Sequence, residues 1–281
     1  MTDTLAAPAF ENAEQLPDDV RGPLRDLILA LADSKRVLGL RYSDRMLGSP
    51  TLEAGIAASS MAQDEWGHAR LTYALLGDLG DEPKALEHER AAQEYRSIAA
   101  LDADINGWAG MTAAALLVDT ALSVQYAALL NSRYTPVHNR VQKLLDEEKF
   151  HYQYAAGWAR RIAQVPELRG ELTEALRRYL APALAWLGRD EAAQRLVDEG
   201  IVTAGPSALR ARYLARVAPV LEEIGAAGAL GLEQRDGSAW TFTGELDWAG
   251  WNDAARRAGG GLDEETAARA RGDKNRALLM D

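Results

Sequence analysis

The chain has 281 residues, of which 47% are hydrophobic, and 31 basic against 42 acidic residues give a net charge of -11. This length and apolar content suffice for one large folded domain, and the negative charge opposes binding to nucleic acid or to an anionic membrane. The chain contains no cysteine, which excludes disulfides, thiolate metal sites and thiol nucleophiles. Any metal ion must therefore be held by His, Asp or Glu.

Residues 1–20 are polar, contain proline and show no hydrophobic period, so we predict a flexible N-terminal arm there. The start of the chain lacks a basic segment followed by an apolar run, and no stretch reaches the ~20 uninterrupted apolar residues of a membrane span. We therefore expect a cytoplasmic protein with no membrane partner.

Two long helices are predicted in the first eighty residues. The first begins at "GPLRDL", with Pro23 in its first turn. Steps of three and four residues define one inward face of this helix, formed by Leu24, Ile28, Leu31, Lys35, Leu38 and Tyr42. The second helix follows "GSPT", with Ser49 as its expected N-cap, and runs to about Leu76.

The following elements are also helical by pattern. A polar peripheral helix is predicted near 84–98, an Ala- and Leu-rich central helix at about 104–132, and a fourth long helix at about 137–163. Shorter helices are predicted at 166–188, 189–198 and 206–225. Residues 231–281 form an aromatic- and Gly-rich extension, where a short hairpin or docking arm and a charged, mobile end are expected. The sequence therefore predicts an all-α fold: a four-helix bundle over 21–230 with additional C-terminal helices and an irregular C-terminal arm.

Two Glu-x-x-His pairs stand within apolar stripes of the long helices: Glu65 with His68, and Glu148 with His151. Residues three apart lie on one helix face, so both side chains of a pair can reach one metal ion. Two such pairs, together with acids from two other helices, form the inward ligand set of carboxylate-bridged di-iron or di-manganese bundles. Asp119, in the apolar stretch "ALLVDTALSV", is the natural further ligand.

The first helix departs from this ligand pattern. Its inward position is Lys35, while Asp33 is two residues away, about 200° around the helix. A lysine ammonium among three carboxylates can replace the charge of one metal ion, which leaves one ion or none; a local rotation of the helix would instead bring Asp33 inward. The same residues are also compatible with a buried polar network that binds no metal, in which Lys35 pairs with the acids.

Three stretches resemble the PaaA/PaaC family, the ferritin-like subunits of the phenylacetyl-CoA oxygenase (epoxidase) of phenylacetate catabolism. These are residues 31–79, residues 146–162 ("DEEKFHYQYAAGWARRI") and the tail "WTFTGELDWAGW". The first two look more like the PaaC-type subunit, which has the same fold but is the structural partner without a working di-iron centre. The tail looks like the end of the catalytic PaaA-type subunit.

The resemblance implies two alternative functions. In the first, the chain is a di-iron or mononuclear monooxygenase component that binds one or two iron ions, or manganese, receives electrons from a separate reductase and oxidises an aromatic acyl-CoA. In the second, it is a non-catalytic PaaC-like subunit with a degenerate, metal-poor site. By resemblance the catalytic subunit has a glutamate where this chain has Lys35, whereas PaaC-type subunits have typically lost the Glu-x-x-His residues that this chain keeps. Either alternative implies a homodimer or heterodimer formed through helix faces.

Overall fold

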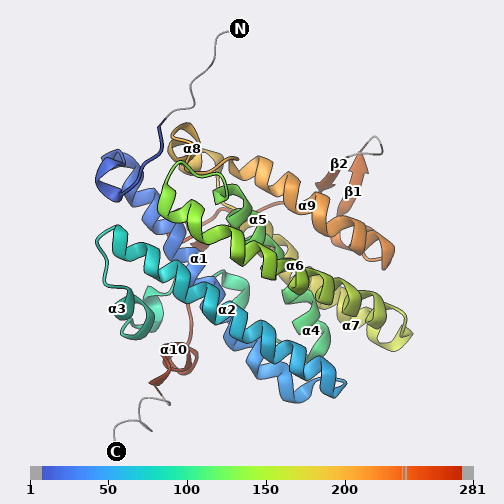
Figure 1. The fold of residues 1–281 in the computed structure, drawn as a ribbon. Coiled ribbons are helices and arrows are strands. Elements are labelled where there is room, and N and C mark those ends of the chain that lie inside the picture. Colours follow the sequence, from blue (N-terminus) through green and yellow to red (C-terminus); the bar gives the residue numbers. More distant parts are fainter. Residues whose placement is uncertain (1–7, 236, 238, 274–281) are drawn as a thin grey trace, which may run out of the picture.

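The computed structural model describes residues 8–235, 237 and 239–273. The described chain is mainly helical with little sheet, which confirms the predicted all-α class (Figure 1). The long helices are α1 (Asp18–Arg45), α2 (Leu52–Asp78), α6 (Thr135–Ala163), α7 (Pro166–Trp186) and α9 (Pro206–Glu223). The shorter helices are α3 (Pro83–His88), α4 (Gly107–Ala114), α5 (Thr120–Leu129), α8 (Asp190–Asp198) and α10 (Glu264–Arg271).

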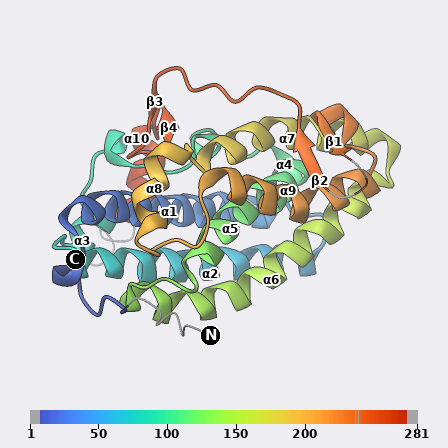
Figure 2. The same ribbon diagram turned by 90° about the horizontal axis from the view of Figure 1, so that it is seen from above.

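Seen from above, the helices form three layers (Figure 2). Helices α2 and α6 make one outer layer, α1 and α5 the middle, and α7, α8 and α9 the opposite layer. α4 and α5 are joined by a π-helical segment, Ala115–Asp119, into one helical stretch. The ferritin-like bundle of α1, α2, α4–α5 and α6 is therefore confirmed, and it surrounds the predicted site.

The stretch Gly107–Leu129 is the one described helix whose length and apolar composition would suit a membrane span, with a mean hydropathy of 1.3. In its most apolar window, 94% of the residues are buried inside the bundle. Its apolar character is therefore explained by its place in the core of the fold.

Several helix ends differ from the prediction. Helix α1 begins at Asp18, before the expected start at Gly22, because Asp18 and Asp19 suit the positive end of the helix dipole. The N-cap of α2 is Thr51 and not Ser49, since the Thr51 hydroxyl accepts a hydrogen bond from the backbone of Ala54 at 3.2 Å.

The predicted polar helix over 84–98 is wrong beyond His88. Only α3 forms there, followed by short 3₁₀ turns at Ala92–Glu94 and Ala99–Leu101. The helix cannot continue because Arg90 turns inward and is buried, where its guanidinium binds the carboxylate of Asp33. A buried ion pair with full hydrogen bonding outweighs local helix propensity at this position.

Helices α1 and α2 approach closely at Gly39. A Cβ atom at this position would lie 2.7 Å from Cδ1 and Nε1 of Trp66 and 3.0 Å from the backbone oxygen of Ala62. Only a glycine therefore allows this approach, which fixes the relative position of two helices that carry site residues.

The C-terminal extension contains two small antiparallel ladders and a helix. Strand β1 (Leu232–Arg235) pairs with β2 (Ala239–Phe242), and β3 (Trp251–Asn252) pairs with β4 (Arg257–Ala258). Between them the chain crosses over the bundle (Figure 2). The hairpin is confirmed, whereas the expected mobile end holds α10, whose backbone oxygen at Ala270 accepts a hydrogen bond from Arg36 at 2.7 Å; residues 274–281 lie outside the described part.

Candidate metal centre

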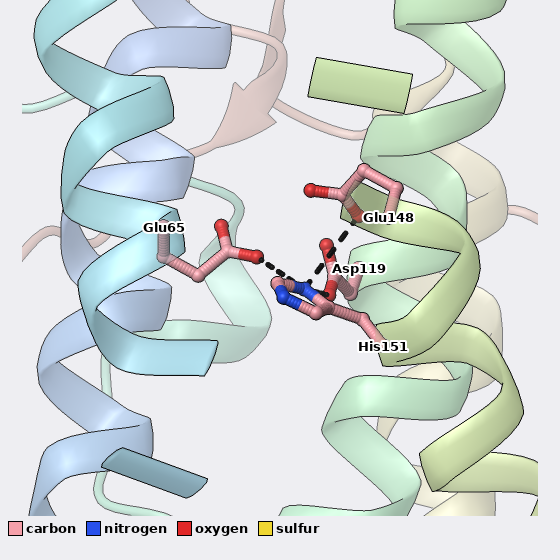
Figure 3. A group of neighbouring side chains, drawn as sticks. All are labelled: Glu65, Asp119, Glu148 and His151. Atoms are coloured by element: carbon pink, nitrogen blue, oxygen red, sulfur yellow. Dashed lines mark hydrogen bonds and ion pairs between the residues drawn. The ribbon is translucent and has the colours of Figure 1, made fainter. Parts of the chain in front are cut away.

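The predicted site residues converge from all four bundle helices. Lys35 comes from α1, Glu65 and His68 from α2, Asp119 from the π-helical segment, and Glu148 and His151 from α6. Each of the six side chains is at most 3% exposed to solvent. Figure 3 shows Glu65, Asp119, Glu148 and His151 pointing toward one another between the helices. We call these six residues the central cluster.

Lys35 occupies the middle of the central cluster. Its ammonium nitrogen lies 2.5 Å from Oε1 of Glu148 and 2.6 Å from Oδ1 of Asp119. Both carboxylate oxygens of Glu65 are also near, at 3.0 and 3.1 Å. All three N–H donors of the ammonium group are therefore matched by carboxylates on three different helix segments.

The choice between Lys35 and Asp33 as the inward residue is decided by the geometry of α1. Asp33 is fully buried on another side of the helix, where its carboxylate accepts hydrogen bonds from Arg90 Nη1 at 2.9 Å, from Tyr73 at 2.5 Å and from the backbone of Arg96 at 2.7 Å. These partners satisfy the Asp33 carboxylate outside the central cluster. Asp33 therefore does not face the cluster, and Lys35 is the inward residue of α1.

A π-helical turn positions Asp119. The segment Ala115–Asp119 is π-helical within an otherwise α-helical stretch, and such turns often occur at functional sites. Asp119 Oδ2 accepts a hydrogen bond from Tyr42 at 3.2 Å, and Ser123, one turn further on, donates to Glu148 Oε2 at 2.8 Å. Neither this turn nor the role of the two hydroxyl groups was indicated by the sequence pattern.

Each of the two imidazoles lies between two sets of acids. One ring nitrogen is close to acids of the central cluster, which we call inner acids, and the other is close to an acid outside it, which we call an outer acid. His151 Nδ1 is 3.1 Å from Glu65 Oε1 and 3.1 Å from Asp119 Oδ2, and its Nε2 is 3.2 Å from Asp64. The second imidazole, His68, lies in the same way between an inner and an outer acid, both of which come from α6. Its Nδ1 is 3.0 Å from Glu148 Oε1 and its Nε2 is 2.7 Å from Glu147.

The outer acids Asp64 and Glu147 were missed by the sequence reasoning. Each directly precedes the glutamate of a Glu-x-x-His pair, and each binds the histidine of the opposite helix. In both motifs an acid directly precedes the Glu-x-x-His sequence. This repeated pattern was the signal that could have identified the two residues. Such outer carboxylates orient an imidazole and raise its basicity.

The charges of the central cluster shift its pKa values strongly. Burial alone would lower the pKa of Lys35, but the carboxylates of Asp119, Glu148 and Glu65 outweigh it and hold that pKa well above its usual range. Burial would likewise raise the pKa of Asp119, yet the Lys35 ammonium and His151 hold it well below its usual range. Lys35 and Asp119 are therefore both charged at neutral pH.

Glu65 titrates differently from Asp119. Burial, followed by the negative charge of Asp119, raises the pKa of Glu65 to about 7, although Lys35 opposes this. Burial would lower the pKa of His151, but its hydrogen bonds to Asp119, Asp64 and Glu65 raise it far above its usual value. Burial would lower the pKa of His68, but Glu148, whose Oε1 lies 3.0 Å from its Nδ1, raises it.

These residues do not fit a dinuclear metal centre. The ligand set of such bundles has a carboxylate from each of the four helices, and four carboxylates balance two divalent ions. Here α1 instead supplies an ammonium group within 2.5–3.1 Å of all three remaining acids. This group occupies the space that a metal ion would need and supplies the positive charge that the ion would bring. Lys35 and His151 both stay protonated at neutral pH, so two positive groups already face the inner acids.

A smaller donor set for one ion remains. Glu65, Asp119, Glu148 and His151 each offer one ligand atom, and these atoms all lie within 4.8 Å of one another (Figure 3). Oxygen and imidazole donors of this kind suit iron and manganese. An ion at this position would need Lys35 to move away or to lose its proton, since two cations would otherwise share the same carboxylates.

Comparison with known proteins identifies the family. The sequence model of the family described as "Phenylacetic acid catabolic protein" (PaaA/PaaC) matches residues 1–243. The chain belongs to this family. Among its relatives is the C subunit of the 1,2-phenylacetyl-CoA epoxidase from Escherichia coli (strain K12), which is 25% identical over 193 residues, covering 67% of this chain and 77% of the relative. The predicted resemblance is thereby confirmed.

Proposed function

We propose that this chain is a structural, non-catalytic subunit of a phenylacetyl-CoA epoxidase-like complex. The observation that carries the proposal is the position of Lys35, whose ammonium nitrogen lies within 2.5–3.1 Å of three buried carboxylates. The ammonium group then serves as the permanent cation of the bundle core. The similarity to the C subunit of the bacterial epoxidase agrees with this role.

Electrostatics supports a core that is stable without metal. Buried carboxylates without counter-charges cost several kcal/mol each, and the central cluster provides a positive partner for every inner acid. The raised pKa of Lys35 has the same origin, since the charges of Asp119, Glu148 and Glu65 favour the protonated amine. A metal ion is therefore not required to hold the four helices together.

We propose a heterodimer with a catalytic family member as the assembly. Three large apolar side chains on the outer layer are strongly exposed: Leu52 and Ile56 on α2, at 76% and 62%, and Phe150 on α6, at 71%. The hydroxyl of Tyr154, one turn after Phe150, donates to the backbone oxygen of Ala54 at 2.9 Å, so these parts of α2 and α6 are neighbours. An exposed apolar face of this kind is typical of an interface.

In this assembly the partner would carry the metal and act on the aromatic acyl-CoA, with electrons from a separate reductase. Homodimerisation through the same face is the alternative. We place the complex in the cytoplasm, as the sequence led us to expect. Mixing the chain with a family member that has a glutamate at the Lys35 position tests the assembly: size-exclusion chromatography with light scattering should give a one-to-one complex, and two separate proteins would refute it.

A second candidate function is favoured by the four ligand atoms that lie within 4.8 Å of one another. In this case one iron or manganese ion would bind Glu65, Asp119, Glu148 and His151, and the chain would be a mononuclear oxygenase component. The donor set alone supports this candidate, while the charge of Lys35 opposes it.

Metal analysis separates the two candidates. The chain is expressed with added iron, dialysed and analysed for iron and manganese by inductively coupled plasma mass spectrometry. The structural role predicts less than about one tenth of an equivalent per chain, because protonated Lys35 and His151 oppose binding. A content near one equivalent would instead support the mononuclear site and reject the structural proposal.

A further inference from the structure

Arg256, in the C-terminal extension, is a buried arginine with an unusual backbone. It is 9% exposed and has a φ of 51°, in the left-handed region that non-glycine residues rarely adopt. Its Nη1 donates to Oε1 of Gln125 at 2.9 Å and to the backbone oxygen of Trp186 at 3.3 Å. These contacts attach the extension to the end of α7, where a positive charge is favourable.

Arg256 differs from the other buried arginines in its lack of an acidic partner. Arg41, Arg90 and Arg257 each form an ion pair with an aspartate. No carboxylate forms such a pair with Arg256 among residues 8–235, 237 and 239–273. Burial accordingly lowers the pKa of Arg256 to about 10. A buried guanidinium without a counter-ion is costly, so an anion beside it would be bound favourably.

A pocket of about 230 Å³ is lined in part by Arg256. A Cβ atom placed on Gly188, which also lines the pocket, would be 3.8 Å from Nη2 and Cζ of Arg256. Within the described residues, Nη2 makes no hydrogen bond, so its donors are available to a ligand. The wall also contains the charged residues Asp26, Arg189 and Asp253, and its apolar part is formed mainly by Pro23, Leu27, Ala192, Ala193 and Leu196.

Each of the two carboxylates in the pocket wall already has another cationic partner. Asp253 accepts hydrogen bonds from Nε of Arg189 at 2.9 Å and from the indole of Trp251 at 3.0 Å. Asp26 is paired with Arg96. The charge of Asp253 opposes the effect of burial on Arg256, but burial outweighs it. The guanidinium of Arg256 therefore has no carboxylate in direct contact within the described residues.

We propose that this pocket binds a small monocarboxylate with an apolar body. The carboxylate would accept hydrogen bonds from Arg256 Nη2, and the apolar body would contact the side chains contributed by α1 and α8. The volume suits a single ring with a carboxyl group, since a cavity of about 150 Å³ already holds benzene. The site uses none of the residues of the central cluster and does not depend on the proposed structural role.

Benzoate is a suitable probe for this site. Titration of the ¹⁵N-labelled full chain with benzoate, followed by the amide resonances, should give saturable shifts at Gly188 and Ala193. Arg256→Gln should weaken binding about tenfold, because a charge-assisted hydrogen bond is lost. Uncharged benzamide should bind correspondingly more weakly than benzoate.

A second variant tests the site independently, in case Arg256→Gln does not fold. Ala192 is exposed at the wall of the pocket, so Ala192→Phe should fill the pocket while leaving Arg256 in place, and should abolish the shifts. Ala74→Phe, at an exposed position of α2, is the matched control and should bind as the unchanged chain does. The proposal fails if no saturable shift occurs, if benzamide or inorganic phosphate binds as well as benzoate, or if Ala192→Phe binds normally.

Discussion

The ammonium nitrogen of Lys35 lies 2.6 Å from Oδ1 of Asp119, in the middle of the bundle, and both side chains are at most 2% exposed. The pair joins α1 to the π-helical turn of the central helix. Glu148 and Glu65 accept the two remaining hydrogen bonds of the same ammonium group. Each N–H donor thus links α1 to a different helix segment, which makes Lys35 the residue on which the stability of the core should depend most.

Replacing Lys35 by methionine should destabilise the protein strongly. The side-chain volume is nearly kept, but three buried carboxylates lose their shared cation, which should lower the free energy of unfolding by about 3–5 kcal/mol. Urea denaturation followed by circular dichroism measures this. Lys149→Met, at an exposed position of α6, should change stability by less than about 0.5 kcal/mol. Equal effects of the two substitutions would contradict the role of Lys35.

Replacing Glu65 by glutamine should change the dependence of stability on pH. The pKa of Glu65 is raised from 4.5 to about 7 in the folded chain, so the folded state holds this proton more tightly than the unfolded state. The resulting stabilisation is fully present below pH 4.5 and is lost as pH rises through 7. Glu65→Gln removes this loss, and its stability relative to the unchanged chain should therefore increase from pH 5 to pH 8.

Urea midpoints at several pH values test this prediction. Glu174→Gln is the matched control, since Glu174 is 74% exposed on α7. It should follow the unchanged chain at every pH. If the difference between Glu65→Gln and the unchanged chain stays constant between pH 5 and pH 8, the raised pKa of Glu65 is wrong.

Two glycine substitutions should have opposite effects. Gly39→Ala places a Cβ atom 2.7 Å from the Trp66 ring, so it should cost about 1–3 kcal/mol through overpacking of α1 against α2. Gly67→Ala, in the middle of α2, meets no atom within 4 Å and should stabilise the helix by about 0.5–1 kcal/mol. Thermal unfolding of both variants compares them directly, and equal shifts would rule out a close helix contact at Gly39.

Much of the bundle could be predicted from the sequence because its signals are periodic. The inward face of the first helix, including Lys35, and the face of the fourth helix with Glu148 and His151 are buried as the spacing indicated. The partner of Asp33 could not be predicted, since Arg90 is 57 residues away. The early end of α3 depends on the same long-range pair.

The details of the central cluster were less accessible. A π-helical turn at Asp119 depends on packing of the surrounding helices and leaves no clear mark in a stretch of Ala and Leu. The ligand pattern of Glu65, His68, Glu148 and His151 could be read from spacing, but spacing cannot tell whether Lys35 displaces a metal ion. Charge and distance decide that question, which is why the metal content is the decisive property.

The most direct test of the account is the iron stoichiometry of Lys35→Glu beside that of the unchanged chain. The substitution restores a fourth carboxylate to the two Glu-x-x-His pairs and Asp119, which completes a dinuclear donor set. After expression with added iron and dialysis, we expect less than about one tenth of an equivalent in the unchanged chain and a content approaching two in the variant. One or two equivalents in the unchanged chain, or no gain in a folded variant, would contradict the conclusion that Lys35 takes the place of the metal.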